Sequence, residues 1–132
     1  MKNLYVGQEV SLSKAFTAKD VELFSELNLD FNQVHLDEKH VENTIFKKRI
    51  VHGYLYGSLF IAIIGTKMPG PGSIYIHQEM NFKKPVFLDE IVTACVKITE
   101  IKPEKSIIYL DTICYKNNNE TVLDGKAIIK LV

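Results

Sequence analysis

Residues 51–68 read VHGYLYGSLFIAIIGTKM, and this stretch decides the fold because it is apolar on nearly every face of a helix. Such a helix must be surrounded by other parts of the protein. The stretch ends at Pro69-Gly70-Pro71-Gly72, where the prolines forbid a helix and the glycines permit tight turns. Its most apolar part, from Tyr54 to Ile64, is too short to span a membrane. We therefore expect one buried central helix.

The residues after this turn show the patterns of β-strands over 73–83, 90–101, 106–115 and 121–131. Within the second segment, apolar residues alternate with other residues at a period of two: Val92, Ala94, Val96 and Ile98. Asn117-Asn118-Asn119 suits a hairpin, because asparagine tolerates left-handed backbone geometry. The expected fold class is α+β, with an antiparallel sheet wrapped around the central helix.

The residues before the central helix predict two shorter helices after a short extended opening. Thr17 is a candidate N-cap, and Asp20 lies three positions later, near the positive end of the helix dipole. Apolar residues then follow at helical spacing: Val21, Phe24 and Leu27. This helix should end near Asn28, and a second short helix is expected over 37–43.

Length and composition fit one domain over residues 1–132, because 132 residues with 46% hydrophobic content build one core and leave no room for a second. Lys+Arg and Asp+Glu both number 16, so the formal net charge is zero. Neither nucleic acid nor an anionic membrane surface is therefore expected as a partner. A neutral chain repels itself little, so self-association is compatible with this composition.

The two cysteines, Cys95 and Cys114, stand singly in apolar, β-branched runs, so we expect two buried thiols in a reducing compartment. The first residues lack the apolar core of a signal peptide. Together these features predict a soluble protein of the cytoplasm.

The segment DFNQVH at 30–35 places a carboxylate and an imidazole ahead of Ile50-Val51-His52-Gly53. An acid–base pair beside a helix start can transfer protons and stabilise an anion. Asp30 and His35 would diverge by roughly 140° on a helix, so they converge only if the segment is a loop. The turn-forming residues Asn28, Asp30 and Asn32 favour a loop.

These motifs together resemble the MaoC-like, (R)-specific enoyl-CoA hydratases, a branch of the hot-dog fold. The resemblance extends from about residue 6 to 131 and rests on four motifs: Asp30-x-Asn32-x-x-His35, Arg49-Ile50-Val51-His52-Gly53, Pro69-Gly70-Pro71-Gly72-Ser73-Ile74-Tyr75, and Phe82-Lys83-Lys84-Pro85-Val86-Phe87 with Asp89. The family usually has proline after the asparagine, where this chain has Gln33. The catalytic loop should therefore be less stiff than in its relatives.

The resemblance implies reversible syn hydration of trans-2-enoyl thioesters to (R)-3-hydroxyacyl thioesters. It implies that Asp30 is the base, that His35 is the water partner and proton donor, and that the substrate is an acyl-CoA or acyl carrier protein thioester. The free backbone N–H of Gly53, at the start of the central helix, is our candidate for the oxyanion hole, and Asn32 should brace the loop. The family's edge-to-edge joining of sheets implies a homodimer, and no metal or other cofactor is expected.

Simpler interpretations exist for most of these residues. Asp30 and Asn32 could be ordinary turn residues, and His35 and His52 structural histidines, with His52 the more structural of the two. A metal site at His35 and His40 lacks the spacing of known zinc motifs. Two other functions also remain open at this point, a hot-dog thioesterase and a non-catalytic subunit that binds acyl thioesters.

Overall fold

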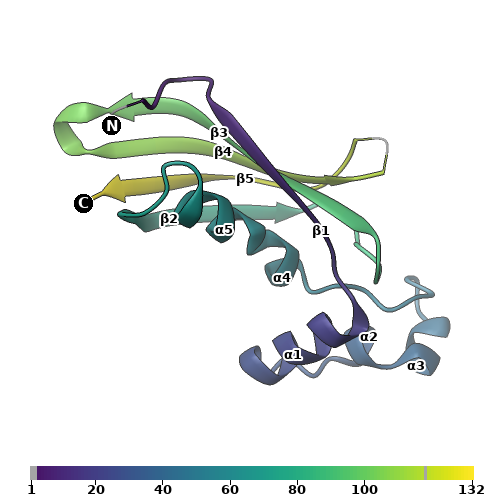
Figure 1. Ribbon diagram of the computed structural model, residues 1–132. Helices are drawn as coiled ribbons and strands as arrows, with labels where there is room; N and C mark the ends of the chain where they lie inside the picture. Colours follow the sequence, from purple (N-terminus) through teal and green to yellow (C-terminus); the bar gives the residue numbers. More distant parts are fainter. Residues whose placement is uncertain (1–2, 118) are drawn as a thin grey trace.

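The computed structural model describes residues 3–117 and 119–132, and its main feature is a five-stranded antiparallel sheet (Figure 1). The strands are β1 Glu9–Ala15, β2 Ser73–Phe82, β3 Ile91–Lys102, β4 Ile107–Lys116 and β5 Glu120–Leu131. Their order across the sheet is β1-β3-β4-β5-β2, and every neighbouring pair is antiparallel. The four predicted strands are confirmed within one or two residues.

β1 is a fifth strand where the sequence predicted only an extended segment. Its residues alternate between the two faces, and Val10 and Leu12 lie opposite Val96 and Ala94 of β3. Both side chains pack against the buried core. A strand of seven mostly polar residues gives a weak local signal, so its pairing with β3 is what reveals it.

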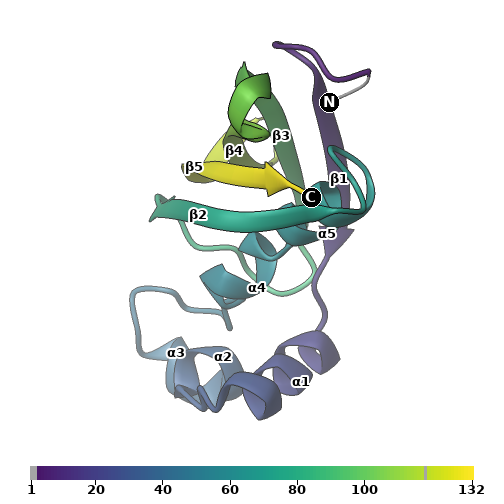
Figure 2. The same cartoon turned by 90° about the vertical axis from the view of Figure 1, so that its left-hand side faces the viewer.

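The helices are α1 Ala18–Asn28, α2 Gln33–Leu36, α3 Glu38–Glu42, α4 Gly53–Gly57 and α5 Leu59–Thr66, with a 3-10 turn η1 at Pro103–Lys105. The predicted cap is confirmed: Thr17 Oγ1 accepts a hydrogen bond from the Asp20 N–H, and Asp20 Oδ2 accepts one from the Thr17 N–H. α1, α2 and α3 form a group beyond one end of the sheet (Figures 1 and 2). Among the described helices, none is long and apolar enough to cross a membrane.

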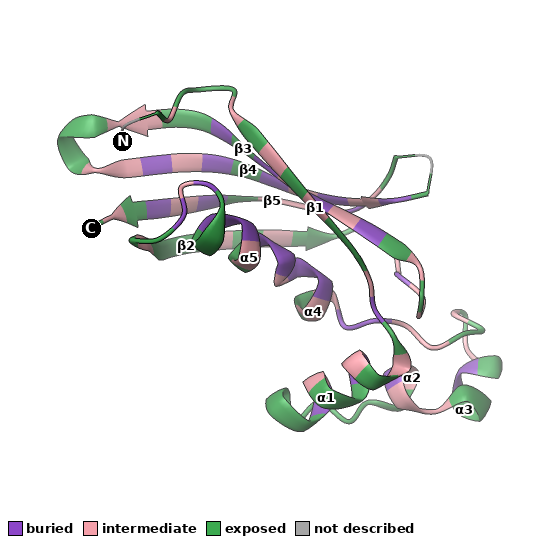
Figure 3. Cartoon of the chain, viewed as in Figure 1, coloured by how far each residue is buried: buried purple, intermediate pink, exposed green. Residues whose placement is uncertain are grey.

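The central helix differs from the prediction in two ways. It is two consecutive pieces, α4 and α5, which meet at Ser58, where the side-chain hydroxyl donates to the Leu55 carbonyl. It is also buried on one face only, because the sheet covers one side (Figure 3). Phe60 and Ile63 are 1% and 0% exposed, whereas Tyr54 and Ile61 are 67% and 60% exposed. The expectation of burial on every side is therefore wrong for a single chain.

The core lies between α5 and the inner face of the sheet. The alternation predicted for the second strand is confirmed, since Val92, Ala94, Val96 and Ile98 are all fully buried. Full burial of each valine or isoleucine side chain stabilises the fold by roughly 1.5–3 kcal/mol. After α5, Gly70 and Gly72 adopt positive φ angles of 92° and 94°, as the predicted turn requires.

The prediction for the cysteines is half correct. Cys114 is buried, and burial raises the pKa of its thiol to about 12. Cys95 is only partly buried, because it lies on the outer face of the sheet near Glu9. Of the predicted asparagine hairpin, Asn117 and Asn119 have positive φ angles of 33° and 64°, and Asn118 lies outside the described residues.

A buried ion pair fastens the loop between β2 and β3. Lys116 Nζ lies 2.8 Å from Glu90 Oε1 and donates to the Pro85 carbonyl at 2.8 Å. Partial burial by itself would raise the pKa of Glu90. Hydrogen bonds from Lys116 and from the Phe87 N–H outweigh that effect and lower the pKa below its usual value of 4.5. The pair therefore holds Pro85 and its neighbours against the end of β4.

We expect Glu90→Gln to lower the free energy of unfolding by about 3 kcal/mol at neutral pH, because it leaves the Lys116 ammonium buried without its partner. Since folding lowers the pKa of Glu90, this stabilisation is present above 4.5 and is lost as the pH falls below that value. The difference from wild type should therefore shrink between about pH 5 and pH 3 in urea unfolding. Glu26→Gln, at an exposed position of α1, is the control. If Glu90→Gln lowered the free energy of unfolding equally at about pH 5 and at about pH 3, the prediction would be contradicted.

Candidate active site

The turn after α1 positions Asp30. Leu29 is the C-cap of α1; it adopts a left-handed conformation with φ 66° and donates its N–H to the Ser25 carbonyl. The Asp30 N–H then donates to Asn28 Oδ1 at 2.8 Å, and the Asn32 N–H donates to Asp30 Oδ1 at 3.0 Å. The second of these side-chain turns occupies Oδ1 of Asp30 and leaves its Oδ2 oxygen to face the interior of the site.

His35 lies on α2, a one-turn helix, and not in an extended loop as predicted. Asn32 is the N-cap of this helix, and its Oδ1 accepts a hydrogen bond from the Val34 N–H at 3.2 Å. Gln33 occupies the first helical position, where proline would also fit. Asp30 lies in the loop and His35 in the helix, so the two residues do not share one helix and their side chains can converge.

Three hydrogen bonds tie α2 to the segment that leads into α4. His35 Nδ1 lies 2.8 Å from the Ile50 carbonyl, the Ile50 N–H donates to the Val34 carbonyl at 3.0 Å, and Arg49 Nε donates to the His35 carbonyl at 2.7 Å. Because a carbonyl only accepts, His35 must carry a proton on Nδ1. Its Nε2 atom therefore performs any proton transfer.

His35 Nε2 lies 3.7 Å from Asp30 Oδ2. This separation is too long for a direct hydrogen bond, so both atoms are available to one small polar molecule. His35 is 8% exposed, whereas the side chain of Asp30 is 46% exposed. The sequence prediction that these two groups lie together therefore matches the geometry.

His52, expected to be structural, completes the cluster. Its ring stacks on that of His35 at 3.7 Å between centroids and 19° between planes. Its Nε2 atom lies 3.8 Å from Asp30 Oδ2 and 3.2 Å from Ser25 Oγ. The sequence contained one signal for a role of His52, its place directly before Gly53. Its stacking with His35 could not be predicted, because the two residues are 17 positions apart in the chain.

The cluster of Asp30, His35 and His52 has the residue types of a metal site, and its ligand atoms lie within 4.8 Å of one another. The stacking makes it unsuitable for a single ion. Imidazole nitrogens bind metals in the plane of the ring, and two nearly parallel rings direct their lone pairs side by side, not toward one point. His40, which was considered together with His35 from the sequence, is not part of this cluster.

Gly53 is the first residue of α4, so its N–H has no partner within the helix. The described residues provide it with no other acceptor. The ring of Phe82 occupies the space next to its α-carbon, and an added Cβ would overlap Phe82 Cε1. A larger residue would therefore have to displace this ring, so glycine favours both the close packing and access to the N–H.

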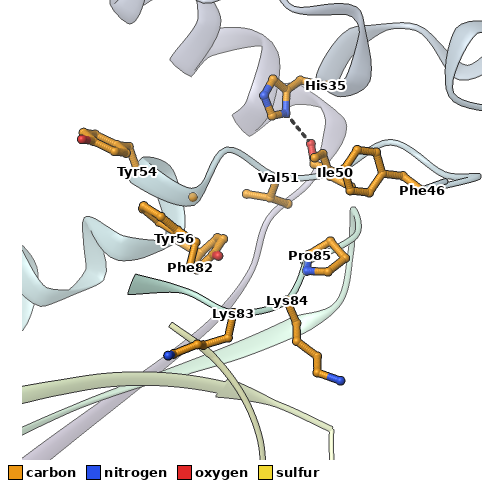
Figure 4. Close-up of a pocket in the computed structure, with 11 residues that line it drawn as sticks. His35, Phe46, Ile50, Val51, Tyr54, Tyr56, Phe82, Lys83, Lys84 and Pro85 are labelled. Atoms are coloured by element: carbon orange, nitrogen blue, oxygen red, sulfur yellow. Dashed lines mark hydrogen bonds between the residues drawn. The ribbon is translucent and has the colours of Figure 1, made fainter. Parts of the chain in front are cut away.

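Two hollows meet at this cluster. An apolar pocket of about 410 Å³ is lined by His35, Phe46, Ile50, Val51, Gly53, Tyr54, Tyr56, Phe82, Lys83, Lys84 and Pro85 (Figure 4). A second hollow of about 310 Å³ is lined by Phe24, Asn28, Asp30, His35, His52, Gly53 and Tyr54. His35 and Gly53 line both, so the larger pocket can hold an apolar group while its polar end reaches Asp30.

The two tyrosines that line the pocket differ in burial. Tyr56 is a core residue, and burial raises the pKa of its hydroxyl to about 12, so it stays neutral where it borders the pocket. Tyr54 is mostly exposed and stacks on Phe82 at 5.9 Å between centroids. Lys83 and Lys84 are exposed at the rim.

Comparison with known proteins identifies close relatives. A family model described as "MaoC like domain" matches residues 4–117. The chain is 42% identical over 130 residues to a protein of Aeromonas caviae named (R)-specific enoyl-CoA hydratase, covering 98% of this chain and 97% of that protein. It is 38% identical over 130 residues to a 3-hydroxybutyryl-CoA dehydratase of Methylorubrum extorquens, with coverage of 98% and 82%.

The solved structure of an (R)-hydratase from A. caviae involved in PHA biosynthesis also matches. Its TM-score is 0.97 at 41% identity, and 100% of each chain is covered. The fold class predicted from the sequence, a hot-dog arrangement of sheet and helix, is therefore confirmed.

We expect Gly53→Ala to lower the free energy of unfolding by about 1–3 kcal/mol, because the new methyl group overlaps the Phe82 ring. In a Phe82→Ala background the same substitution should cost clearly less, since the space is then open. Urea unfolding of the two single variants and the double variant measures this coupling. Equal losses in both backgrounds would show that Phe82 does not determine the requirement for glycine.

Proposed function

Because this chain belongs to the MaoC-like family, we propose that it is an (R)-specific enoyl-CoA hydratase, a hydro-lyase that adds water reversibly to trans-2-enoyl thioesters. The observation that supports this function best is the geometry of one carboxylate and one imidazole. Asp30 Oδ2 and His35 Nε2 lie 3.7 Å apart, beside the N–H of Gly53 and at the edge of an apolar pocket. A water molecule between them can be deprotonated, and an alkene can lie next to it.

Each group has one task in the hydration direction. Asp30 takes a proton from water, and the hydroxide oxygen forms a bond to the β carbon of the enoyl group. The electron pair of the double bond moves to the α carbon and the thioester oxygen. His35, which enters the step with protons on both ring nitrogens, delivers the one on Nε2 to the α carbon and keeps the one on Nδ1. Transfer of the proton from Asp30 to Nε2 of His35 restores the carboxylate and the imidazolium, so one water is consumed per turnover. Dehydration runs through the same steps in reverse.

The carboxylate and the imidazole approach the alkene from one side, so the hydroxyl and the proton add to the same face. This arrangement supports syn addition and a single configuration at the new hydroxyl, which the family assigns as (R). The N–H of Gly53 meets the developing charge on the thioester oxygen, and one such donor is typically worth about 2.7–4 kcal/mol in the transition state. The acyl chain lies in the apolar pocket.

We expect Asp30→Asn and His35→Ala each to lower kcat for hydration of crotonyl-CoA by about 10²–10⁴-fold, because each removes one proton-transfer group. The assay follows loss of the enoyl absorbance together with free thiol. Asp111→Asn and His40→Ala, both exposed positions away from the cluster, are matched controls. Unchanged hydration in the two site variants would refute the catalytic assignment, and release of free thiol by the wild type would indicate a thioesterase.

The proposal includes a homodimer joined through β2, and it retains the cytoplasmic location expected from the sequence. β2 is an edge strand of the sheet, and one of its long sides has no partner strand among the described residues. Large apolar side chains are exposed on β2 and on the adjacent face of the helix: Tyr54, Ile61, Ile74, Ile76 and Phe82. An exposed edge beside an apolar patch favours pairing with a second copy.

We expect light scattering to give the mass of two chains for the wild type and of one chain for Ile76→Lys, since the lysine places a charge on the exposed edge. Ile45→Lys is the control, because Ile45 is 90% exposed but lies far from β2 in the sequence. A single-chain mass for the wild type would contradict the dimer.

A further inference from the structure

His52 has a buried nitrogen without a hydrogen-bond partner. The residue is 4% exposed, and its Nδ1 atom contacts neither a donor nor an acceptor among the described residues. The mechanism above assigns no role to this imidazole, although its ring stacks directly on His35. A buried polar atom without a partner in a native fold requires an explanation.

The contacts of His52 determine where its proton resides. A neutral imidazole carries one proton, on either Nδ1 or Nε2. The carboxylate of Asp30, with Oδ2 3.8 Å from Nε2, attracts a proton on that atom, and Ser25 Oγ at 3.2 Å can accept a hydrogen bond from it. Nε2 therefore carries the proton, and Nδ1 is the bare nitrogen.

His52 is also held uncharged. Burial lowers its pKa, and the positive charge that His35 can carry lowers it further, against the opposing effect of Asp30. The ring of Phe24 also contacts that of His52, with centroids 5.1 Å apart and the two planes at 76°. Burial thus disfavours a second proton on His52.

We propose that His52 is a positioning residue for the hydration reaction, a neutral imidazole that aligns Asp30 and His35. Its Nε2–H directs the free oxygen of Asp30 toward His35, while its ring face supports the His35 ring in the plane that the Ile50 carbonyl sets. Ser25 holds the Nε2–H when Asp30 turns toward water. His52 is the N-cap of α4 as well, so the same residue places this pair against the Gly53 N–H. The inference rests on the proposed function.

The test compares His52→Phe, which keeps a ring for stacking but lacks the N–H, with His52→Gln, which keeps a donor. We expect His52→Phe to lower kcat about 100-fold with KM within about threefold, as misplaced catalytic groups do. The acidic limb of its pH profile should move to higher pH, because the carboxylate form of Asp30 loses the favourable electrostatic interaction with the N–H of His52, whose Nε2 lies 3.8 Å from Asp30 Oδ2. Two ionisable groups lie near the His52 ring: Asp30, from the loop after α1, and His35, from α2. From α1, Ser25 and Phe24 contact the same ring.

His52→Gln should recover at least part of kcat and return the acidic limb toward its wild-type position. His40→Gln, at an exposed position of α3, is the matched control and should match the wild type. A folded His52→Phe variant with wild-type kcat and pH profile would overturn the proposal. Failure of His52→Gln to recover any activity would also overturn the role of the N–H.

A second measurement does not depend on activity or on whether a variant folds. In ¹⁵N-histidine NMR of the wild type, neutral His52 should carry its proton on Nε2, and its pKa should lie below the usual 6.5 of histidine. A proton on Nδ1, or a pKa at or above 6.5, would overturn the proposal. Absence of hydratase activity in the wild type would instead refute the proposed function, so the two failures are distinguishable.

Discussion

The hydrogen bond from His35 Nδ1 to the Ile50 carbonyl is the contact on which the site depends. It joins the group of α1, α2 and α3 to the part of the chain built on the sheet. Ile50 itself pairs with Phe87, and the Val51 N–H donates to the Val86 carbonyl at 2.7 Å, so the acceptor is paired with the same loop that Lys116 and Glu90 fasten. The position of the proposed catalytic nitrogen is thus set by backbone atoms that are anchored in the core.

The same bond also selects the chemistry. With one proton committed to Ile50, His35 can exchange protons only through Nε2, which lies toward Asp30. Stacking against His52 restricts rotation of the ring, and the cap that Asn32 provides fixes the short helix that carries it. Proton transfer to carbon requires this kind of preorganisation, because a displaced donor loses most of its effect. One acceptor carbonyl therefore controls both the tautomer and the direction of the reactive atom.

The single chain leaves one part of its fold uncovered. A sheet of five strands covers one face of α4 and α5, and the opposite face keeps Tyr54 and Ile61 exposed beside the unpaired edge of β2. The apolar pocket borders this region, since Tyr54 lines it. Residues 51–68 have the hydropathy of a helix that is covered on both faces, whereas the single chain covers only one face.

The sequence by itself determined the features that depend on near neighbours in the chain. The Thr17 cap, the alternation in β3, the glycine turn after the central helix and the motif that holds Asp30, Asn32 and His35 were all readable, because a local conformation needs only local residues. The tertiary structure alone decided the pairing of β1, the partial exposure of Cys95, the exposed face of the central helix and the place of His52. Each of these depends on which distant segment lies opposite, and periodicity shows that a face is apolar without showing what packs against it. His52 illustrates the limit: its neighbours in sequence indicate a helix start, while its ring contacts residues from two other helices.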